Sequence, residues 1–335
     1  MSRPANRLEV WAPEGLPEVL AGDDLAGIVL AAVGRDLADG DVLCLTSKVV
    51  SKAEGRSRVG DRDAAIEEET DRVVARRGST RIVRHRLGLT MAAAGVDASN
   101  VAAGSIVLLP LDPDRSARDL RREVRERAGT NVGVVVTDTA GRAWREGQTD
   151  IAIGAAGLVV AEDHAGRTDG YGNPLVVTLP AVADELAGAA ELAQGKLAGR
   201  PLAVVRGRAD LVLPPGQDGP GAVALVRPEG ADLFGYGARE AVLRALRGDP
   251  ADRAPFGAPV PAAELAATVR AELGLHAASV PGGVEVSVPP GVTATLAVLA
   301  FAHGWELGPP FDTAVDPGSR ATHESNLVGL RPVTP

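Results

Sequence analysis

The sequence predicts an α/β or α+β fold with a mixed sheet. Short β-branched runs such as Val134–Val136 are typical of buried strands, and they alternate with amphipathic stretches such as residues 25–37. The order of these elements follows no strict βαβ rhythm, and the sequence shows no internal repeat of fixed period. We therefore favour a mixed sheet over a doubly wound dinucleotide-binding domain.

The composition predicts a soluble globular protein with a core of small aliphatic side chains. The chain has 335 residues, which is long for one domain and sufficient for two, and 45% of them are hydrophobic. Only 3% are aromatic, so Ala, Val and Leu must fill the core. The formal net charge of −9 argues against nucleic acid or an anionic membrane as a partner, so acidic ligands would need local basic groups.

The single cysteine, Cys44, lies in the apolar run Val42–Leu45, and we expect a buried, unreactive thiol. One cysteine excludes an internal disulfide framework. The N-terminus lacks the basic-then-apolar pattern of a signal peptide, and no apolar run approaches the ~18 residues of a membrane span. We therefore expect a cytoplasmic protein.

Periodicity and capping residues predict the elements of the first 248 residues. Asp23 and Asp24 are candidate N-caps of the first helix, Asp39–Asp41 is a turn, and Pro110 ends a strand. We expect strands at 7–11, 42–45, 105–109, 134–136, 174–178 and 202–205. We expect helices at 25–37, 61–77, 116–128, 181–193 and 237–246; the second of these is strongly charged, with a thin apolar stripe.

Several prolines between Gly248 and Pro261 predict a domain boundary. We therefore divide the chain into a domain of residues 1–248 and a small C-terminal α/β unit of residues 249–335. In the second unit we expect helices at 262–273 and 294–303 and a strand at 284–288. The last ten or so residues show little pattern, and we expect poor order there.

The end of the Val134–Val136 strand carries side chains suited to a metal ion. Asp138 and the hydroxyl of Thr139 are hard oxygen donors of the kind that Mg²⁺ and Mn²⁺ prefer. Arg142 and Arg145 follow within one turn, which would bring phosphate-binding cations close to these donors. Ligands of α/β proteins commonly bind at such strand ends. The alternative is a polar turn that follows a core strand.

Hydroxyl and cationic side chains gather in residues 46–56, directly after the strand at 42–45. Ser47, Lys48 and Lys52 have the chemistry of a phosphate-binding segment. The segment is not a Walker A loop, because it lacks the glycines of that motif, and no Gly-x-Gly-x-x-Gly opens a helix. The alternative is a solvated loop rich in serine and lysine.

Residues 91–101 place an acid and an amide within four positions. Asp97 could join Asp138 on a metal ion, and Asn100 could bind a base or a ribose. The alternative is a turn capped by Asp97. Residues 81–86 supply three arginines and a histidine, which form either an anion-binding surface or a solvated basic edge. The remaining histidines lack metal-binding spacing.

Five separated segments of the chain form one ordered set of motifs. They are Gly15–Leu25, Thr46–Arg56, Ala94–Val101, Thr137–Asp150 and Gly195–Lys196. In this order they resemble the coenzyme F420-0:γ-glutamyl ligase family, over roughly residues 7–247. The closest likeness is to the ligase half of the bacterial, actinobacterial-type members.

The resemblance implies a family-specific, two-lobed fold and a homodimer that uses GTP to add L-glutamate to coenzyme F420-0 through γ-linkages. It implies nucleotide contacts at Leu16, Pro17, Glu18, Val19, Ser47, Lys52 and Asn100. It implies divalent-metal ligands at Asp97, Asp138 and Thr139, for Mg²⁺ or Mn²⁺, with K⁺ as a further candidate ion. Archaeal members carry an acidic or amide ligand where this chain has Lys196, which could instead neutralise phosphate.

From this resemblance we expect Asp138, Lys52 and Arg142 to carry the catalysis, by phosphoryl transfer from GTP to the acceptor carboxylate and then amide formation. A ligase of the same architecture with another acceptor, and a non-catalytic nucleotide-binding protein, are the alternatives. Fused relatives continue into a flavin-binding nitroreductase-like domain. The residues after 248 are too few for that domain, so we expect no flavin and no flavin reductase activity.

Overall fold

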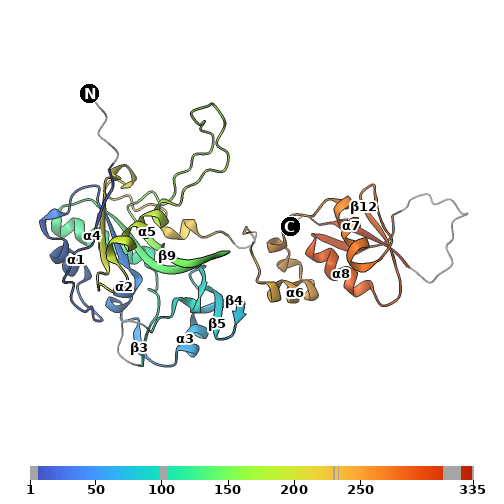
Figure 1. Cartoon of the computed structure of the whole chain (residues 1–335), viewed down its shortest axis with the longest axis horizontal. Helices are drawn as coiled ribbons and strands as arrows, with labels where there is room; N and C mark the ends of the chain where they lie inside the picture. Colours follow the sequence, from blue (N-terminus) through green and yellow to red (C-terminus); the bar gives the residue numbers. More distant parts are fainter. Residues whose placement is uncertain (1–6, 99–103, 229–230, 233, 312–325, 334–335) are drawn as a thin grey trace, which may run out of the picture. The chain divides into compact units, whose positions relative to one another are not determined.

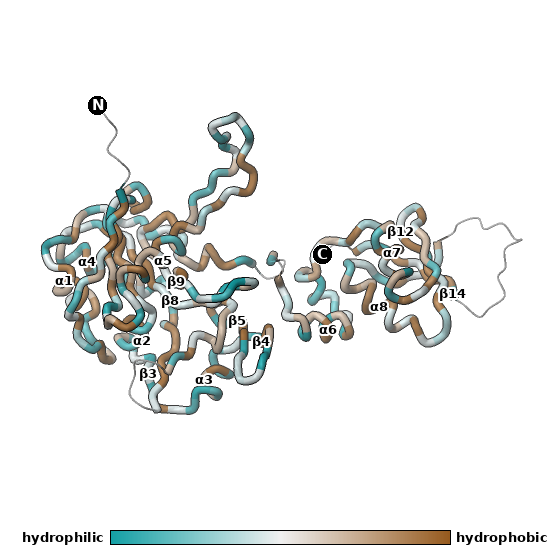
Figure 2. The backbone as a smooth tube through the Cα atoms, viewed as in Figure 1, coloured by the Kyte–Doolittle hydropathy of each residue, from teal (hydrophilic) through white to brown (hydrophobic). Residues whose placement is uncertain are grey.

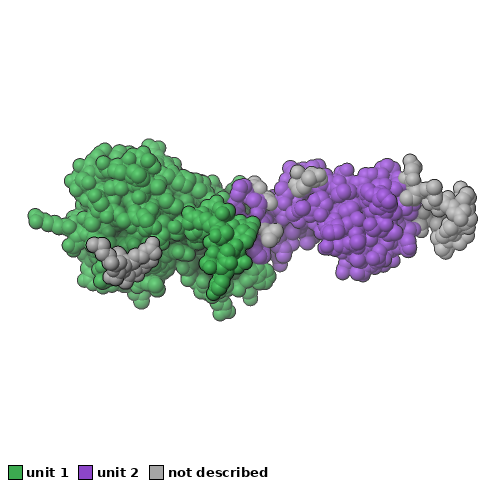
Figure 3. Space-filling model, turned by 90° about the horizontal axis from the view of Figure 1, so that it is seen from above, with its two compact units in different colours: residues 1–226 green, residues 227–335 purple. Residues whose placement is uncertain are grey.

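The computed structural model describes residues 7–98, 104–228, 231–232, 234–311 and 326–333. The chain divides into two compact units, Met1–Val226 and Arg227–Pro335 (Figures 1 and 3). This division falls earlier in the chain than the expected boundary at 248/249. It does so because helix α6 (Ala238–Arg247) packs against helix α8 (Thr293–Ala302) of the second unit.

A five-stranded mixed sheet forms the centre of the first unit (Figure 1). Its strands lie in the order β1 (Glu9–Trp11), β10 (Leu202–Arg206), β2 (Val42–Thr46), β8 (Gly133–Arg142) and β9 (Arg145–Ala156). β2 and β8 are parallel, and the other neighbouring strands are antiparallel. The prediction of an α+β fold with a mixed sheet is therefore confirmed.

Helices cover both faces of this sheet. On one face lie α1 (Leu25–Val33), α2 (Ser47–Ala53) and α4 (Pro113–Ala128), and on the other lies α5 (Val182–Gln194). Both core clusters consist almost entirely of aliphatic side chains, as the low aromatic content predicts. Asp112 caps the beginning of α4, and Gly129 ends it in a left-handed conformation.

A smaller lobe of the first unit contains one helix and two small sheets. Its elements are β3 (Ser57–Val59), α3 (Arg62–Glu69), β4 (Thr70–Arg77), β5 (Thr80–His85), β6 (Thr90–Ala92) and β7 (Ser105–Val107). β3 pairs with β7, and β4, β5 and β6 form a three-stranded sheet. The lobe has its own core cluster, which includes Ile66 and Val83.

The single helix predicted for residues 61–77 is wrong. α3 follows the N-cap Asp61 and ends at Glu69, and the chain continues as β4, which pairs with β5 in an antiparallel ladder. The β-branched residues Val73 and Val74 suit a strand, and they gain a pairing partner that a helix would not offer. Because charged residues are dense throughout the segment, the change from helical to strand periodicity at Thr70 is hard to recognise in the sequence.

Two further predictions, of a strand and of a loop, are corrected. Residues 174–178 form no strand; they belong to the long loop between β9 and α5, where Thr168 and Pro174 make an isolated bridge. The segment 46–56 was expected as a loop in one interpretation, yet Ser47–Ala53 is the helix α2. Short 3₁₀ helices complete the first unit at Gly34–Asp36, Ala93–Gly95, Ala209–Leu211 and Ala222–Leu225.

The described residues of the second unit form a four-stranded antiparallel sheet and three α-helices. Besides α6 and α8, its elements are α7 (Ala262–Leu273), β11 (Ala277–Val280), β12 (Gly283–Val288), β13 (Trp305–Gly308), β14 (Asn326–Pro332) and the 3₁₀ turns Pro250–Asp252 and Ala254–Phe256. The sheet order is β11-β12-β14-β13. The poor order expected near the C-terminus is wrong for β14, because this strand pairs on both sides.

Candidate active site

The far end of β8 places consecutive side chains on opposite faces of the central sheet. Val136 belongs to the core cluster beneath α1, α2 and α4, whereas Val135 belongs to the cluster beneath α5. Because side chains alternate along a strand, Asp138 faces α2 and Thr139 faces α5. β2 ends at Thr46, so these last positions of β8 extend beyond it, beside the beginning of α2.

Asp138 is held by the first residue of α2. Ser47 Oγ donates a hydrogen bond to Asp138 Oδ1 at 2.9 Å. The pKa of Asp138 is raised to about 6, chiefly because the side chain is withdrawn from water and also because Asp150 and Asp97 are negatively charged, while the Ser47 hydrogen bond acts in the opposite direction. A carboxylate in these surroundings is stabilised by any cation that binds next to it.

The two lysines of α2 already have carboxylate partners. Lys48 Nζ lies 2.7 Å from Asp97 Oδ2, and Lys52 Nζ forms a short ion pair with Glu18 Oε1. The Lys52 side chain is only 11% exposed, whereas the Glu18 side chain is 71% exposed. An incoming phosphate could therefore replace the exposed partner, Glu18, on the mostly buried Lys52.

A second polar cluster lies on the α5 side of β8. Asp150, in β9, is buried, and it accepts hydrogen bonds from Thr137 Oγ1 at 3.0 Å and from Thr139 Oγ1 at 2.8 Å. Lys196, just after α5, donates to Thr139 Oγ1 at 2.7 Å and lies 3.2 Å from Glu191. The structure thus joins the predicted residues Thr139 and Lys196 to each other and to Asp150.

Sequence reasoning assigned no role to Asp150 or Glu191. The turn alone does not give Asp150 away, because regular pairing from Arg142 and Arg145 would place Thr139 opposite residue 148. A register shift between Gly141 and Arg142 places Thr139 opposite Asp150 instead. Glu191 lies about one helical turn before Lys196, at the end of α5, which no motif marks.

Arg142 lies apart from Asp138. The polar turn expected directly after Thr139 is wrong, because β8 continues to Arg142 and pairs there with Arg145 at the tip of the β8–β9 hairpin. Figure 2 shows the hairpin change from hydrophobic near the sheet to hydrophilic toward its tip. The Arg142 side chain is exposed, and its guanidinium donates to the carbonyl of Glu146 at 2.9 Å.

The segment Leu16–Val19 is partly a core element. Val19 is buried and Leu16 packs against the same core cluster, so their side chains support the segment from within. Pro17 and Glu18 line a surface hollow of about 550 Å³, whose other acidic residues are Glu14, Asp23 and Asp24. Such a lining disfavours the phosphates of a nucleotide, which fit better beside the lysines of α2. Asn100, predicted to contact the nucleotide, lies outside the described residues.

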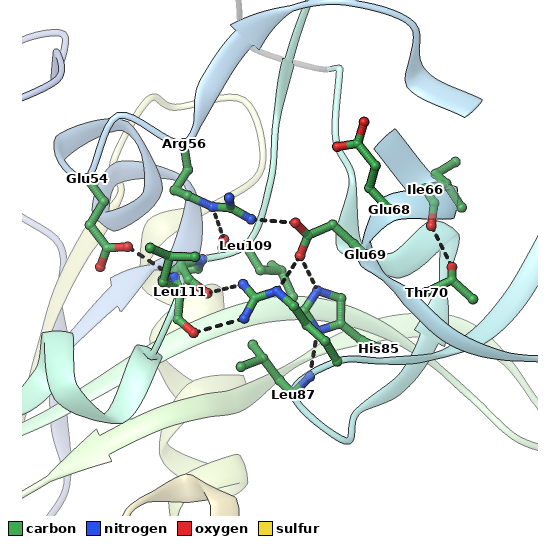
Figure 4. Close-up of polar contacts among 12 residues, drawn as sticks. Glu54, Arg56, Ile66, Glu68, Glu69, Thr70, His85, Leu87, Leu109 and Leu111 are labelled. Atoms are coloured by element: carbon green, nitrogen blue, oxygen red, sulfur yellow. Dashed lines mark hydrogen bonds and ion pairs between the residues drawn. The ribbon is translucent and has the colours of Figure 1, made fainter. Parts of the chain in front are cut away.

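The buried carboxylate of Glu69 binds two of the basic residues at 81–86, His85 and Arg86 (Figure 4). Glu69 accepts hydrogen bonds from Arg56 Nη2 at 2.7 Å and from Arg86 Nε at 2.6 Å. The fully buried His85 accepts through Nδ1 from the N–H of Leu87, so its Nε2 donates to Glu69 at 3.1 Å. This network holds β5 against α3, which excludes His85 from an open anion-binding surface. 

The other two arginines of this edge form ion pairs within the smaller lobe. Arg81 Nη2 lies 3.2 Å from Asp63, and Arg84 Nε lies 3.6 Å from Asp71. These contacts favour the interpretation of a structural basic edge over that of a substrate-binding surface.

The oxygen donors of the site suit a divalent ion that shares its coordination with a substrate. The described part of the chain holds no cluster of three or more His, Cys, Asp or Glu side chains arranged for a metal. Magnesium typically uses one or two carboxylates and completes its shell with water and substrate phosphates. Asp138 and Asp97 offer that number of carboxylates, and the pKa of Asp138 is raised first by withdrawal from water and then by nearby acids, so that a bound cation would stabilise its charge. The residues present therefore fit such an ion.

Comparisons with known proteins show which family the chain is similar to. The model of the F420-0:gamma-glutamyl ligase family matches residues 15–62 and 62–207, more than half of the chain. The chain belongs to this family. The match includes Asp97, Asp138, Asp150 and Lys196, and it ends before the second unit begins. The ligase family thus accounts for the first unit.

Several archaeal relatives are named coenzyme F420:L-glutamate ligase. The Archaeoglobus fulgidus protein is 42% identical over 222 residues, which are 60% of this chain and 88% of the relative. The Methanopyrus kandleri protein is 41% identical over 211 residues, or 57% and 83% of the two chains. The Methanothermobacter thermautotrophicus protein is 38% identical over 249 residues, or 66% and 96%. Among the described residues of this family member, no helix is long and apolar enough to cross a membrane.

Proposed function

We propose that this chain is a coenzyme F420:L-glutamate ligase, which joins the amine of L-glutamate to F420-0 through a γ-glutamyl amide bond. Three relatives of that name align with this chain over 83–96% of their own length, at 38–42% identity. The observation that carries the proposal is the Ser47–Asp138 contact, which ties a carboxylate withdrawn from water to the helix α2 that also carries Lys48 and Lys52.

We infer that GTP supplies the free energy in two steps. An oxygen of the acceptor carboxylate attacks the γ-phosphorus, the bond from that phosphorus to the β-phosphate oxygen breaks, and GDP leaves. The amine nitrogen of glutamate then attacks the acyl carbon, the bond from that carbon to the phosphate oxygen breaks, and inorganic phosphate leaves. The nitrogen releases its proton to solvent as the amide forms.

The side chains of α2 would position and neutralise the phosphates. Lys52 would exchange Glu18 for a phosphate oxygen, and Ser47 would keep Asp138 oriented throughout. Lys196 would add a cation on the other side of β8, and Arg142 would meet an anionic substrate from the hairpin tip. The nucleotide contact proposed for Asn100 rests on the family resemblance.

Asp97 and Asp138 would hold Mg²⁺ or Mn²⁺ on the α2 side of β8, and Thr139 would offer its hydroxyl oxygen to a divalent ion on the α5 side. When bound, the ion would neutralise the charge that builds on the transferring phosphoryl group. Asp97 would have to release Lys48 to do so, which frees that ammonium for phosphate. Without a cation, the carboxylates of Asp97 and Asp138 disfavour each other. K⁺ remains a further candidate ion.

We also propose a homodimer. The described part of the first unit exposes apolar side chains on the loop between β9 and α5, which are Tyr171, Val176, Val177 and Leu179. Exposed groups of this kind commonly lie in contacts between subunits. Light scattering on the purified chain gives the mass: twice the chain mass is expected, and a monomer at micromolar concentration contradicts the homodimer.

The decisive experiment mixes the purified chain with F420-0, GTP, Mn²⁺ and L-glutamate and reads product masses over time. We expect F420-0 to gain glutamate residues and GDP to appear in equal amount. Omitting glutamate, replacing GTP by ATP, and chelating the metal are the three controls. A folded chain that leaves both F420-0 and GTP unchanged contradicts the proposal.

The same assay separates the alternatives. Release of GDP with other carboxylate acceptors, but without F420-0 extension, indicates a ligase of the same architecture with another substrate. GTP binding without any GDP release indicates a non-catalytic nucleotide-binding protein.

A further inference from the structure

We propose that Asp150 is a positioning residue. It orients the hydroxyl of Thr139 so that the oxygen lone pairs face the ammonium of Lys196 and a bound divalent ion. The inference deepens the proposed function and rests on it. It starts from a carboxylate that is only 4% exposed and that contacts two hydroxyls at once. The buried carboxylate has no further role in the reaction as derived above.

The direction of the hydrogen bonds decides what Thr139 can do. An ionised carboxylate accepts hydrogen bonds and donates none, so both threonine hydroxyl protons point to Asp150. The oxygen of Thr139 is then left with lone pairs alone for its other neighbours. Lys196 Nζ already uses one of them, at 2.7 Å. Asp150 therefore makes Thr139 Oγ1 an acceptor for positive charge.

The two threonines that contact Asp150 are not equivalent. Thr137 is completely buried, and its hydroxyl donates a hydrogen bond to Asp150 within the protein interior. Thr139 is half-buried and lies beyond the end of β2, where the sheet opens toward the exposed Lys196. Thr137 therefore provides a matched control, since it makes the same bond to the same carboxylate without facing the site.

The hairpin explains why this orientation is stable. Asp150 lies directly opposite Thr139 in the ladder between β8 and β9, so the backbone of both strands fixes the distance between the two side chains. A carboxylate that is buried and bound at both oxygens loses little further conformational freedom when the site becomes occupied. Pre-orientation of this kind is what residues behind a metal ligand supply.

The test measures binding of Mn²⁺ alone to the full chain, by the electron paramagnetic resonance signal of free Mn²⁺, without nucleotide. We expect Asp150→Asn and Thr139→Val each to weaken Mn²⁺ binding about ten-fold or more. The double variant should bind no more weakly than Thr139→Val, because Asp150 acts through that hydroxyl. Thr139→Ser should recover most of the affinity, and Thr137→Val should change it less than about two-fold.

Circular dichroism establishes that each variant is folded. Wild-type Mn²⁺ affinity in Asp150→Asn overturns the inference, and so do losses that add up in the double variant. An equal loss in Thr137→Val and Thr139→Val overturns it as well, and this comparison decides the matter even where Asp150→Asn does not fold. A wild-type chain that binds no Mn²⁺ contradicts the metal site of the proposed function itself, which is a different outcome from unaltered binding by the variant.

Discussion

At the scale of single residues, Asp138 is a carboxylate whose surroundings oppose its own charge. One hydroxyl, from Ser47, supports it, while Asp150 and Asp97 oppose its ionisation. We predict that Asp138→Asn keeps the fold and lowers ligase turnover about a thousand-fold or more, because the amide keeps the shape but cannot offset a cation.

The control for this variant is Asp119→Asn, an exposed carboxylate on α4 that pairs with Arg122. Initial rates of GDP release and thermal melting are measured on both variants. Turnover of Asp138→Asn within ten-fold of the wild-type rate, in a chain with an unchanged melting curve, contradicts the assignment.

Lys52 gives a second prediction at this scale. Lys52→Ala should weaken GTP binding more than F420-0 binding, because its side chain is mostly buried beside Glu18 and its expected ligand is a phosphate. Isothermal titration calorimetry with each ligand separates the two affinities. The partner variant Glu18→Gln should preserve or strengthen GTP binding, since it removes the competing anion. Equal GTP affinity in Lys52→Ala and wild type would assign the lysine to a structural ion pair.

The residue types of the site could be predicted from the sequence, but their partners could not. Asp138 and Ser47 each follow an apolar run that was predicted as a strand, but the helix α2, which carries Ser47 and Lys52, was not predicted. The contact between Ser47 and Asp138 spans 91 positions and depends on the parallel pairing of β2 with β8, which no local pattern specifies. Asp150 is similar: its place opposite Thr139 depends on a register shift between Gly141 and Arg142, which the position of the turn does not specify.

At the scale of secondary-structure elements, the helix α3 and the strands β4 and β5 show where local patterns mislead. The segment 61–77 has the charge density of a surface helix, but its second half pairs with β5, so tertiary pairing overrides propensity. The apolar strands β2 and β10 were predicted closely, because buried strands appear as continuous β-branched runs, whereas only the buried first part of β8 was predicted.

The buried pair of His85 and Glu69 makes the smaller lobe sensitive to acid. The pKa of His85 is lowered to about 4, first because burial disfavours its charged form and second because Arg86 is positively charged. In the unfolded chain a histidine titrates near 6.5, so below this pH the unfolded chain binds a proton that folded His85 does not bind until about pH 4. The free energy of unfolding is therefore unaffected by this group above pH 6.5 and decreases as the pH falls from 6.5 toward 4. We expect the free energy of unfolding to fall by about 2 kcal/mol between pH 7.5 and 5 from this group.

Urea unfolding at the two pH values measures this loss. His85→Gln, whose amide can still donate to Glu69, should flatten the dependence on pH, while His276→Gln, at an exposed position, should leave it unchanged. A pH dependence that is the same in wild type and His85→Gln would show that the histidine does not titrate with folding in this range.

At the scale of the whole molecule, the family match and the core clusters coincide with the first unit. We predict that a chain ending at Val226 folds and retains glutamate addition, because all the site residues precede that position and the first unit has its own cores. Ending the chain at Gly248 instead would keep α6 without its packing partner α8, against which this helix lies in the full chain.

Turnover, melting temperature and mass by light scattering are compared among the full chain and the two truncated chains. A folded chain of residues 1–226 without ligase turnover contradicts the prediction. Loss of the dimer with turnover retained would assign the second unit to assembly.

The second unit also supports a prediction about flavin. We expect the purified full chain to be colourless and to show no affinity for FMN. Its aromatic side chains Tyr236, Phe256 and Phe301 contact one another, with ring centroids 5.5 and 5.7 Å apart, so they are engaged in its own core. Absorbance of the purified protein and fluorescence titration with FMN measure this. Stoichiometric bound FMN would contradict it.

The burial of Cys44 has a practical consequence for labelling. The only thiol of the sequence lies at the centre of β2, is fully covered, and has a pKa raised to about 12 by its withdrawal from water. Maleimide dyes react with thiolates, which this side chain scarcely forms at neutral pH. The native chain is therefore suited, without removal of its own cysteine, to site-specific dye pairs at engineered surface cysteines, one in each unit, so that fluorescence energy transfer follows their separation during turnover.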